Sequence, residues 1–167
     1  MKRLLFLLCF IGFMQAEDKQ FVVVVAGYNN ADWYRVNLAS IASQQYPSNL
    51  WRVIYVDDCS TDGTAELVEN FIVQNNLGDR VTFIKNDKRR GGLYNQFHAI
   101  CSCDDDEIVV MLDGDDWFAH CNVLRVLNRI YQDSNVWITC GKYRTFPFGE
   151  IGPPGEFCPE VVEKNAY

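Results

Sequence analysis

The fold of this chain is decided by the stretch Ile108-Val109-Val110-Met111-Leu112-Asp113-Gly114-Asp115-Asp116-Trp117, an apolar run that breaks into three carboxylates. An apolar run without polar alternation is typical of a strand that is buried on both faces of a parallel sheet. The acids then lie at the carboxyl end of that strand. Side chains two positions apart in an extended segment point the same way, so we expect Asp113 and Asp115 to face one ligand, with Asp116 beside them.

These three acids predict a metal site. Neighbouring carboxylates raise one another's pKa unless a cation or hydrogen-bond donors keep them ionised. Hard oxygen ligands favour Mg²⁺ or Mn²⁺, so the sequence predicts one of these ions at Asp113, Asp115 and Asp116. The simpler alternative is a turn and a helix N-cap, because Asp and Gly are common in turns and acids favour the start of a helix.

Length and composition predict one globular domain. The chain has 167 residues, 49% of them hydrophobic, which is enough for one sizeable core. Residues 1–16 combine Lys2-Arg3 with an apolar run too short to span a bilayer comfortably, the layout of a secretory signal peptide or a short N-terminal anchor. We therefore expect a secretory or membrane-associated location; a misassigned start codon is the alternative.

Charge and cysteine usage limit the classes of partner. A formal net charge of −7 argues against nucleic-acid binding, and the one basic cluster is expected to face phosphates instead; it comprises Lys85, Lys88, Arg89 and Arg90. Seven cysteines occur, one of them within residues 1–16, which leaves an even number for pairing in an oxidising compartment. Their spacings match no common zinc site.

Strand-like and helix-like segments alternate along the chain. Strands are expected at residues 21–26, 51–56, 81–85, 108–112 and 136–140, and helices at residues 32–45, 64–76, 93–101 and 123–132. This alternation predicts an α/β fold with a mostly parallel sheet and helices on both faces, spanning residues 20–145. Residues 146–167, rich in Pro and Gly, are expected to form an irregular tail.

Three polar clusters each follow a predicted strand, and the carboxyl ends of parallel strands form the usual ligand crevice. The clusters are Tyr28-Asn29, Asp57-Asp58 and residues 113–116. An aromatic ring offers a face to a base, a carboxylate accepts hydrogen bonds from a base or ribose, and a metal held by acids neutralises phosphates. Together they predict a nucleoside diphosphate site. Neither a G-x-G-x-x-G nor a P-loop motif is present.

Three motifs carry a resemblance to a known family. They are VVVVAGYNN at residues 22–30, VDDCSTDGT at residues 56–64 and LDGDD at residues 112–116. In order and spacing they resemble the successive nucleotide-sugar motifs of family 2 glycosyltransferases, which have the GT-A fold. The resemblance covers roughly residues 20–145. The Ala26-Gly27 pair departs from the residues usual there, which implies a looser fit around the base.

The resemblance implies roles for the nucleotide-binding residues. Tyr28 would stack on the nucleobase next to Asn29, Asp58 would bond the base, and Asp57 would assist nearby. Asp113 would reach the ribose and the metal.

It also implies roles for the metal and the donor sugar. Asp115 would complete the DxD pair with Asp113, and Asp116 would share the ion. Gly92 and Asn95, at the start of a helix, would flank the donor sugar and its phosphates.

The implied activity is transfer of a sugar from a nucleotide-diphospho-sugar to an acceptor, with Mn²⁺ or Mg²⁺ as cofactor. The acceptor, a saccharide, lipid or protein, and the catalytic base are not identified by the sequence. Residues 146–167 resemble the stretch that precedes the acceptor-binding half in this family. The alternative is therefore a truncated, non-catalytic protein that only binds the nucleotide sugar.

Overall fold

The computed structural model describes residues 17–152. The predicted signal or anchor, and the part of the tail after residue 152, lie outside the described residues and stay predictions. The chain divides into two compact units between Gln132 and Asp133, and each unit is described by itself. Within residues 17–152, the helices are too short or too polar to cross a membrane.

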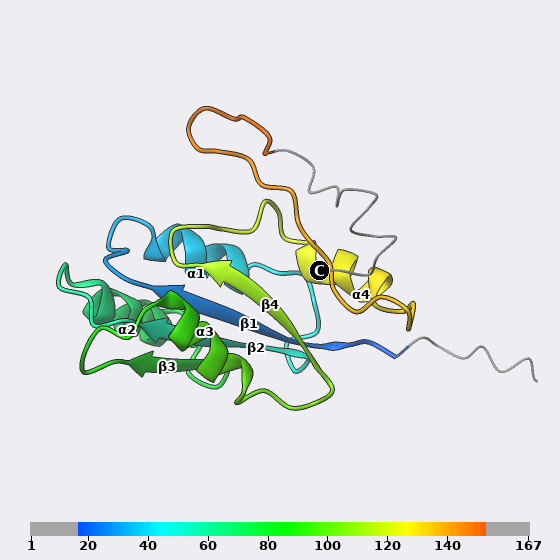
Figure 1. Ribbon diagram of the computed structural model, residues 1–167, viewed down its shortest axis with the longest axis horizontal. Coiled ribbons are helices and arrows are strands. Elements are labelled where there is room, and N and C mark those ends of the chain that lie inside the picture. Colours follow the sequence, from blue (N-terminus) through cyan, green and yellow to red (C-terminus); the bar gives the residue numbers. More distant parts are fainter. Residues whose placement is uncertain (1–16, 153–167) are drawn as a thin grey trace, which may run out of the picture. The chain divides into compact units, whose positions relative to one another are not determined.

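The first unit is a four-stranded parallel sheet with helices on both faces, in the strand order β3-β2-β1-β4 (Figure 1). This arrangement confirms the predicted α/β class. The elements in chain order are β1 Gln20–Gly27, α1 Tyr34–Ala42, β2 Trp51–Asp57, α2 Thr64–Gln74, β3 Val81–Lys85, α3 Gly92–Ile100, β4 Glu107–Asp113 and α4 Val123–Ile130.

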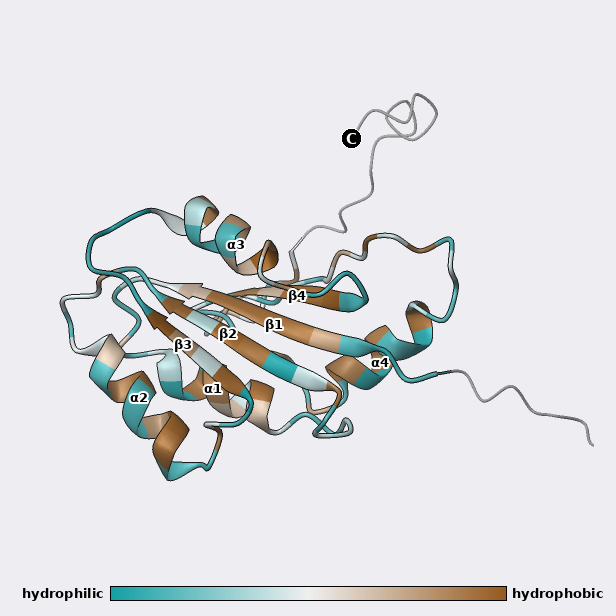
Figure 2. Cartoon of the chain, turned by 90° about the horizontal axis from the view of Figure 1, so that it is seen from below, coloured by the Kyte–Doolittle hydropathy of each residue, from teal (hydrophilic) through white to brown (hydrophobic). Residues whose placement is uncertain are grey.

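The core lies on both faces of β1. Val22 and Val24 pack toward α3, where Ala99 is buried with them. Phe21, Val23 and Val25 face the side that α1, α2 and α4 cover. Figure 2 shows α3 alone on one face of the sheet and the other three helices on the opposite face. The unbroken valine run of β1 is explained by this double burial, because neither face meets water.

The strand at residues 108–112 differs from its prediction. It pairs only with β1 among the described strands, so β4 forms an edge of the described sheet and its side chains are half-buried. Met111 is 55% exposed. The strand buried on both faces is β1. The apolar run of β4 packs against the core through Ile108, Val110 and Leu112, although β4 is the outermost described strand.

The predicted strand at residues 136–140 is wrong for the described residues. A strand needs a hydrogen-bonded neighbour, and within residues 133–152 the only β-bridge joins Arg144 to Ile151. Trp137 and Ile138 are 90% and 84% exposed. The hydrophobic composition of residues 136–140 is typical of a strand, but no described segment of the second unit pairs with them.

The register of the sheet sets the position of the polar residues that follow the strands. Gly27 at the end of β1 lies opposite Asp57 of β2, and Ala26 lies opposite Asp113 of β4. Asp57 in turn lies opposite Lys85 of β3. The carboxyl ends of all four strands therefore lie along the same side of the sheet, the carboxyl edge. The predicted site residues, which follow these ends, come together there as expected.

Core packing of α2 gives a first prediction. Val68 is fully buried against the sheet, whereas Val73 on the same helix is 75% exposed. Val68→Ala is expected to lower the free energy of unfolding by about 2 kcal/mol, because two buried methyl groups are lost and a cavity remains. The matched change Val73→Ala is expected to stay within about 0.5 kcal/mol. Urea denaturation measures both, and equal losses would contradict this placement of α2.

Candidate functional site

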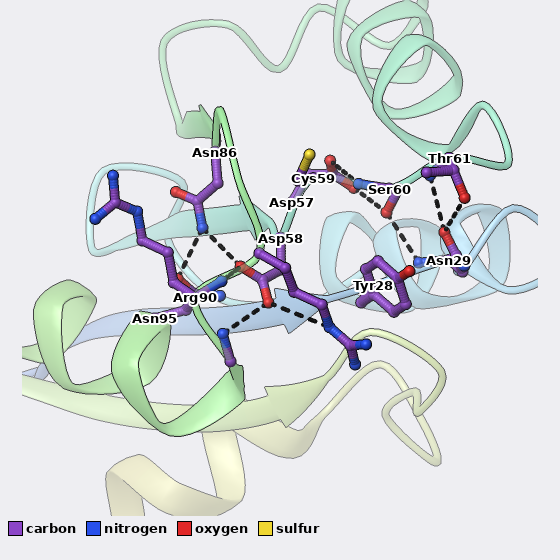
Figure 3. A network of polar contacts seen from close by, with 12 residues as sticks. Tyr28, Asn29, Asp57, Asp58, Cys59, Ser60, Thr61, Asn86, Arg90 and Asn95 are labelled. Atoms are coloured by element: carbon purple, nitrogen blue, oxygen red, sulfur yellow. Dashed lines mark hydrogen bonds and ion pairs between the residues drawn. The ribbon is translucent and has the colours of Figure 1, made fainter.

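The loop after β1 is fixed by two asparagines. Asn30 is buried, and its side-chain oxygen accepts a hydrogen bond from the Tyr28 backbone N–H at 2.8 Å. The side-chain oxygen of Asn29 accepts one from the Thr61 N–H at 2.9 Å, while the Asn29 N–H donates to the Ser60 hydroxyl at 2.9 Å (Figure 3). Asn29, predicted beside the nucleotide, therefore joins this loop to the loop after β2.

The two aspartates after β2 have different environments. Asp57 is fully buried, and its carboxylate accepts hydrogen bonds from the Ser60 N–H at 3.0 Å and the Ser60 hydroxyl at 2.5 Å. These bonds close the turn that follows β2. Asp57 is thus engaged by its own loop, and Asp58 is the carboxylate that turns toward the segment after β3 (Figure 3).

Three donors surround the Asp58 carboxylate. One oxygen accepts from the Asn86 side-chain amide at 2.9 Å and from the Arg90 N–H at 2.8 Å, and the other accepts from the Gly91 N–H at 2.9 Å. Burial alone would raise the pKa of Asp58, but these hydrogen-bond donors outweigh it and lower the pKa to about 2. Asp58 is therefore ionised and acts only as an acceptor.

Arg89 lies against both residues predicted to bind the base. Its guanidinium carbon is 3.9 Å from the centre of the Tyr28 ring, and its Nε is 4.0 Å from the Asp58 carboxylate. The Arg89 side chain is 65% exposed. Two other members of the basic cluster pair elsewhere: Lys85 with Glu66 and Arg90 with Asp87. Sequence reasoning placed this cluster near phosphates and missed the contact of Arg89 with the aromatic ring.

The start of α3 lies beside Asp58. Gly91 has a φ of +93°, which favours glycine, and this geometry lets its N–H point at the carboxylate while Gly92 begins the helix. Asn95, one turn along, is buried; its side-chain oxygen accepts from Asn86 at 2.9 Å. The Asn95 side-chain nitrogen has no hydrogen-bond partner. This end of α3 therefore holds a buried donor that a ligand oxygen would satisfy.

The acidic loop after β4 is packed tightly against the loop after β1. A Cβ on Gly114 would lie 2.5 Å from the side-chain oxygen of Asn30 and 2.9 Å from Cα of Gly27. Position 114 therefore needs glycine. The Asp116 N–H donates to the Asp113 carbonyl at 3.1 Å, which makes residues 113–116 a turn.

Part of the simpler interpretation of this loop is confirmed. Residues 113–116 do form a turn, but they do not cap a helix, because α4 begins at Val123 after Asn122. Burial, followed by the charges of Asp115 and Asp113, raises the pKa of Asp116. The acids are thus close enough to repel one another, as the sequence suggested.

The predicted metal cluster is not formed by side chains alone. Within residues 17–152, no three His, Cys, Asp or Glu side chains lie together in a way that would hold a metal ion. The Asp113 carboxylate instead accepts a long hydrogen bond from the Gln96 side chain, at 3.4 Å. Any ion at this loop would need oxygen ligands from a bound molecule as well.

Asn37 is a residue of this region that sequence reasoning missed. It belongs to α1 and is fully buried, and its side-chain nitrogen donates to the carbonyls of Asp113 at 3.0 Å and Asp116 at 2.7 Å. A polar residue between the apolar positions Val36 and Leu38 of a helix was the available signal.

Comparison with known proteins shows which proteins this chain resembles. The chain is 32% identical over 98 residues to poly(ribitol-phosphate) beta-N-acetylglucosaminyltransferase TarS of Staphylococcus aureus, a match that covers 59% of this chain and 16% of that protein. It therefore spans a small part of this relative. The crystal structure of S. aureus TarS 1-349 in complex with UDP-GlcNAc matches with a TM-score of 0.60 and 27% identity, covering 70% of this chain and 32% of that one.

A second solved structure and a family model agree with this relationship. The mannosyltransferase PcManGT from Pyrobaculum calidifontis, in complex with GDP-Man and Mn²⁺, matches with a TM-score of 0.58 and 27% identity, over 69% of this chain and 32% of that one. The family model described as glycosyl transferase family 2 matches residues 22–157, most of the chain. The resemblance noted in the sequence motifs is thereby confirmed, and the chain belongs to glycosyl transferase family 2.

Proposed function

We propose that this chain binds a nucleotide-diphospho-sugar at the carboxyl edge of its sheet and presents the sugar for transfer to an acceptor. The observation that carries the proposal is the ionised Asp58 carboxylate beside the Tyr28 ring, with the acidic turn following the neighbouring strand β4. A solved relative binds UDP-GlcNAc and another binds GDP-Man, which supports this class of donor.

The base would be read by Asp58. A carboxylate has about four acceptor positions, and three positions at Asp58 are filled by Asn86, Arg90 and Gly91. Arg89 Nε is 4.0 Å from the oxygen that accepts from Gly91, a distance too long for a hydrogen bond, so one acceptor position remains. One free acceptor suits a base with a single ring N–H, which is the pattern of uracil. A base stacked on the same face of Tyr28 as Arg89 would displace the guanidinium.

The diphosphate would lie between the start of α3 and the acidic turn. A helix N-terminus stabilises phosphate charge, and the unpartnered Asn95 amide offers a further donor there. Mg²⁺ and Mn²⁺ are commonly held by one or two carboxylates together with phosphate oxygens. Asp113 and Asp115 supply hard oxygen ligands of this kind, with Asp116 next to them. Such an ion would neutralise the charge of the departing diphosphate.

Transfer also requires a base for the acceptor hydroxyl. Acceptor-dependent release of UDP from UDP-GlcNAc, assayed with Mn²⁺ and a panel of saccharide, lipid and polyol-phosphate acceptors, distinguishes a transferase from a protein that only binds the donor.

The ionised state of Asp58 predicts a pH-dependent contribution to stability. Its pKa in the folded chain, about 2, lies below its ordinary value of 3.8, so ionised Asp58 stabilises the fold above about pH 4 and this contribution disappears as pH falls to about 2. Asp58→Asn is expected to cost on the order of 2 kcal/mol at pH 7 and much less at pH 2. Asp105→Asn, at an exposed acid, is the control. Urea unfolding of both variants across this range measures the difference, and a loss for Asp58→Asn that does not change with pH would contradict it.

The acidic turn predicts a metal-dependent gain in nucleotide affinity. Calorimetry should find that the full chain binds UDP-GlcNAc more tightly with Mn²⁺ than with EDTA, and that Asp113→Ala combined with Asp115→Ala abolishes the gain. The control pair, Asp105→Ala with Asp106→Ala, removes the same charge from exposed positions before β4 and should leave the gain intact. Equal affinity with and without Mn²⁺ in the unmodified chain would refute the metal site.

A further inference from the structure

Helix α1 and the residues directly after it present a row of polar side chains to the segment that follows β4. Asn37 and Gln44 are buried and Ser40 is half-buried. Asn37 and Ser40, three residues apart, lie on one face of α1, and Gln44 follows two residues after the helix ends at Ala42. A buried helix face is ordinarily apolar, so these polar side chains require partners.

The last two members of the row, Ser40 and Gln44, bind the segment beyond the acidic turn. The Ser40 hydroxyl accepts from the Phe118 N–H at 3.0 Å. The Gln44 side chain donates to the His120 carbonyl at 2.9 Å and accepts from the Leu124 N–H at 3.1 Å. These bonds hold residues 118–124, which connect the turn to the start of α4, against α1 and the residues after it.

Asn37 is the member that holds the acidic turn itself. Its single side-chain nitrogen donates to the carbonyls of Asp113 and Asp116, the first and last residues of the turn. The side-chain oxygen of Asn37 has no partner, although it is buried. Leaving a buried acceptor unpaired carries a free-energy cost. The two bonds that Asn37 donates to the turn, and not the packing of α1, therefore explain why an asparagine is buried at this position.

From this geometry we infer that Asn37 is a positioning residue, which sets the spacing of Asp113 and Asp116 and so aims the carboxylates at the metal-bound diphosphate. The inference rests on the proposed function and extends it to a residue outside the binding motifs. Repulsion among the acids tends to open the turn. The bridge from Asn37 opposes this opening before any ligand binds, so less ordering is left to the binding step.

The consequence is a separation of effects on affinity. Loss of Asn37 should weaken the contribution of Mn²⁺ to diphosphate binding, because the carboxylates are no longer held at their spacing. Uridine should bind as before, since its proposed partners Tyr28 and Asp58 are held by Asn30 and by the segment of residues 86–91, which lie outside the turn that Asn37 holds.

The test compares Asn37→Ala with Gln44→Ala in the full chain. Both changes remove a buried polar side chain that makes two hydrogen bonds to residues 113–124, so both should lower the free energy of unfolding in urea. Calorimetry with UDP, in Mn²⁺ and in EDTA, should find the Mn²⁺-dependent gain reduced about 10- to 100-fold in Asn37→Ala and unchanged in Gln44→Ala. Uridine affinity should be unchanged in both.

A measurement without metal or nucleotide completes the test. The Asp116 N–H bonds to the Asp113 carbonyl within the turn, so its hydrogen exchange should become faster in Asn37→Ala and not in Gln44→Ala. If Asn37→Ala does not fold, Asn37→Ser serves in its place, because a hydroxyl donates only one bond and cannot bridge both carbonyls.

The outcomes separate the two proposals. A full Mn²⁺-dependent gain in the Asn37 variant, or a parallel loss of uridine affinity, would overturn the positioning role while leaving the proposed function standing. Absence of any gain in the unmodified chain would overturn the proposed metal-dependent function, and the positioning role with it.

Discussion

The site depends on the close contact of two backbone segments, at Gly27, the last residue of β1, and at Gly114 after β4. A Cβ on either glycine would meet the side-chain oxygen of Asn30, at 2.6 Å from position 27 and 2.5 Å from position 114. That oxygen also accepts the Tyr28 N–H. One asparagine thus holds the backbone of Tyr28 and fills the space beside the acidic turn, so its side chain lies between the two loops.

Many polar side chains at the carboxyl edge of the sheet hydrogen-bond to one another or to nearby backbone groups, and so hold the loops of this edge in place. Asn29 and Asp57 satisfy neighbouring backbone groups, and Asn86 connects Asp58 to Asn95. What remains available to a ligand is smaller: one acceptor position on Asp58, the buried Asn95 nitrogen and the exposed acids of the turn. A site with few free groups held by many engaged ones is preorganised, because little ordering is left for the binding step.

The sequence predicted those features that local pattern controls. The valine run of β1, the strand ends and the motifs at residues 56–64 and 112–116 placed the strands and the polar edge correctly. It could not distinguish Asp57 from Asp58 beyond the family pattern, because their difference arises from donors more than 25 residues away, at Asn86, Arg90 and Gly91. Asn37 and Arg89 were missed for the same reason: each acts through a contact distant in sequence. The strand predicted at 136–140 failed because apolar content does not supply a pairing partner.

The parallel register between β1 and β4 has a consequence for how this chain can change. A slip of one residue would turn Asp113 to the other face of the sheet and move the whole acidic turn along the strand. Backbone hydrogen bonds form equally well in a slipped register, so the register is fixed by the burial of apolar residues and by the glycine contact at the strand ends. Interior residues such as Val22 and Val24 are therefore open to exchange with other branched apolar residues of similar volume, without moving the polar edge. Volume-conserving substitutions in the sheet interior should therefore leave the positions of the polar residues at the carboxyl edge unchanged.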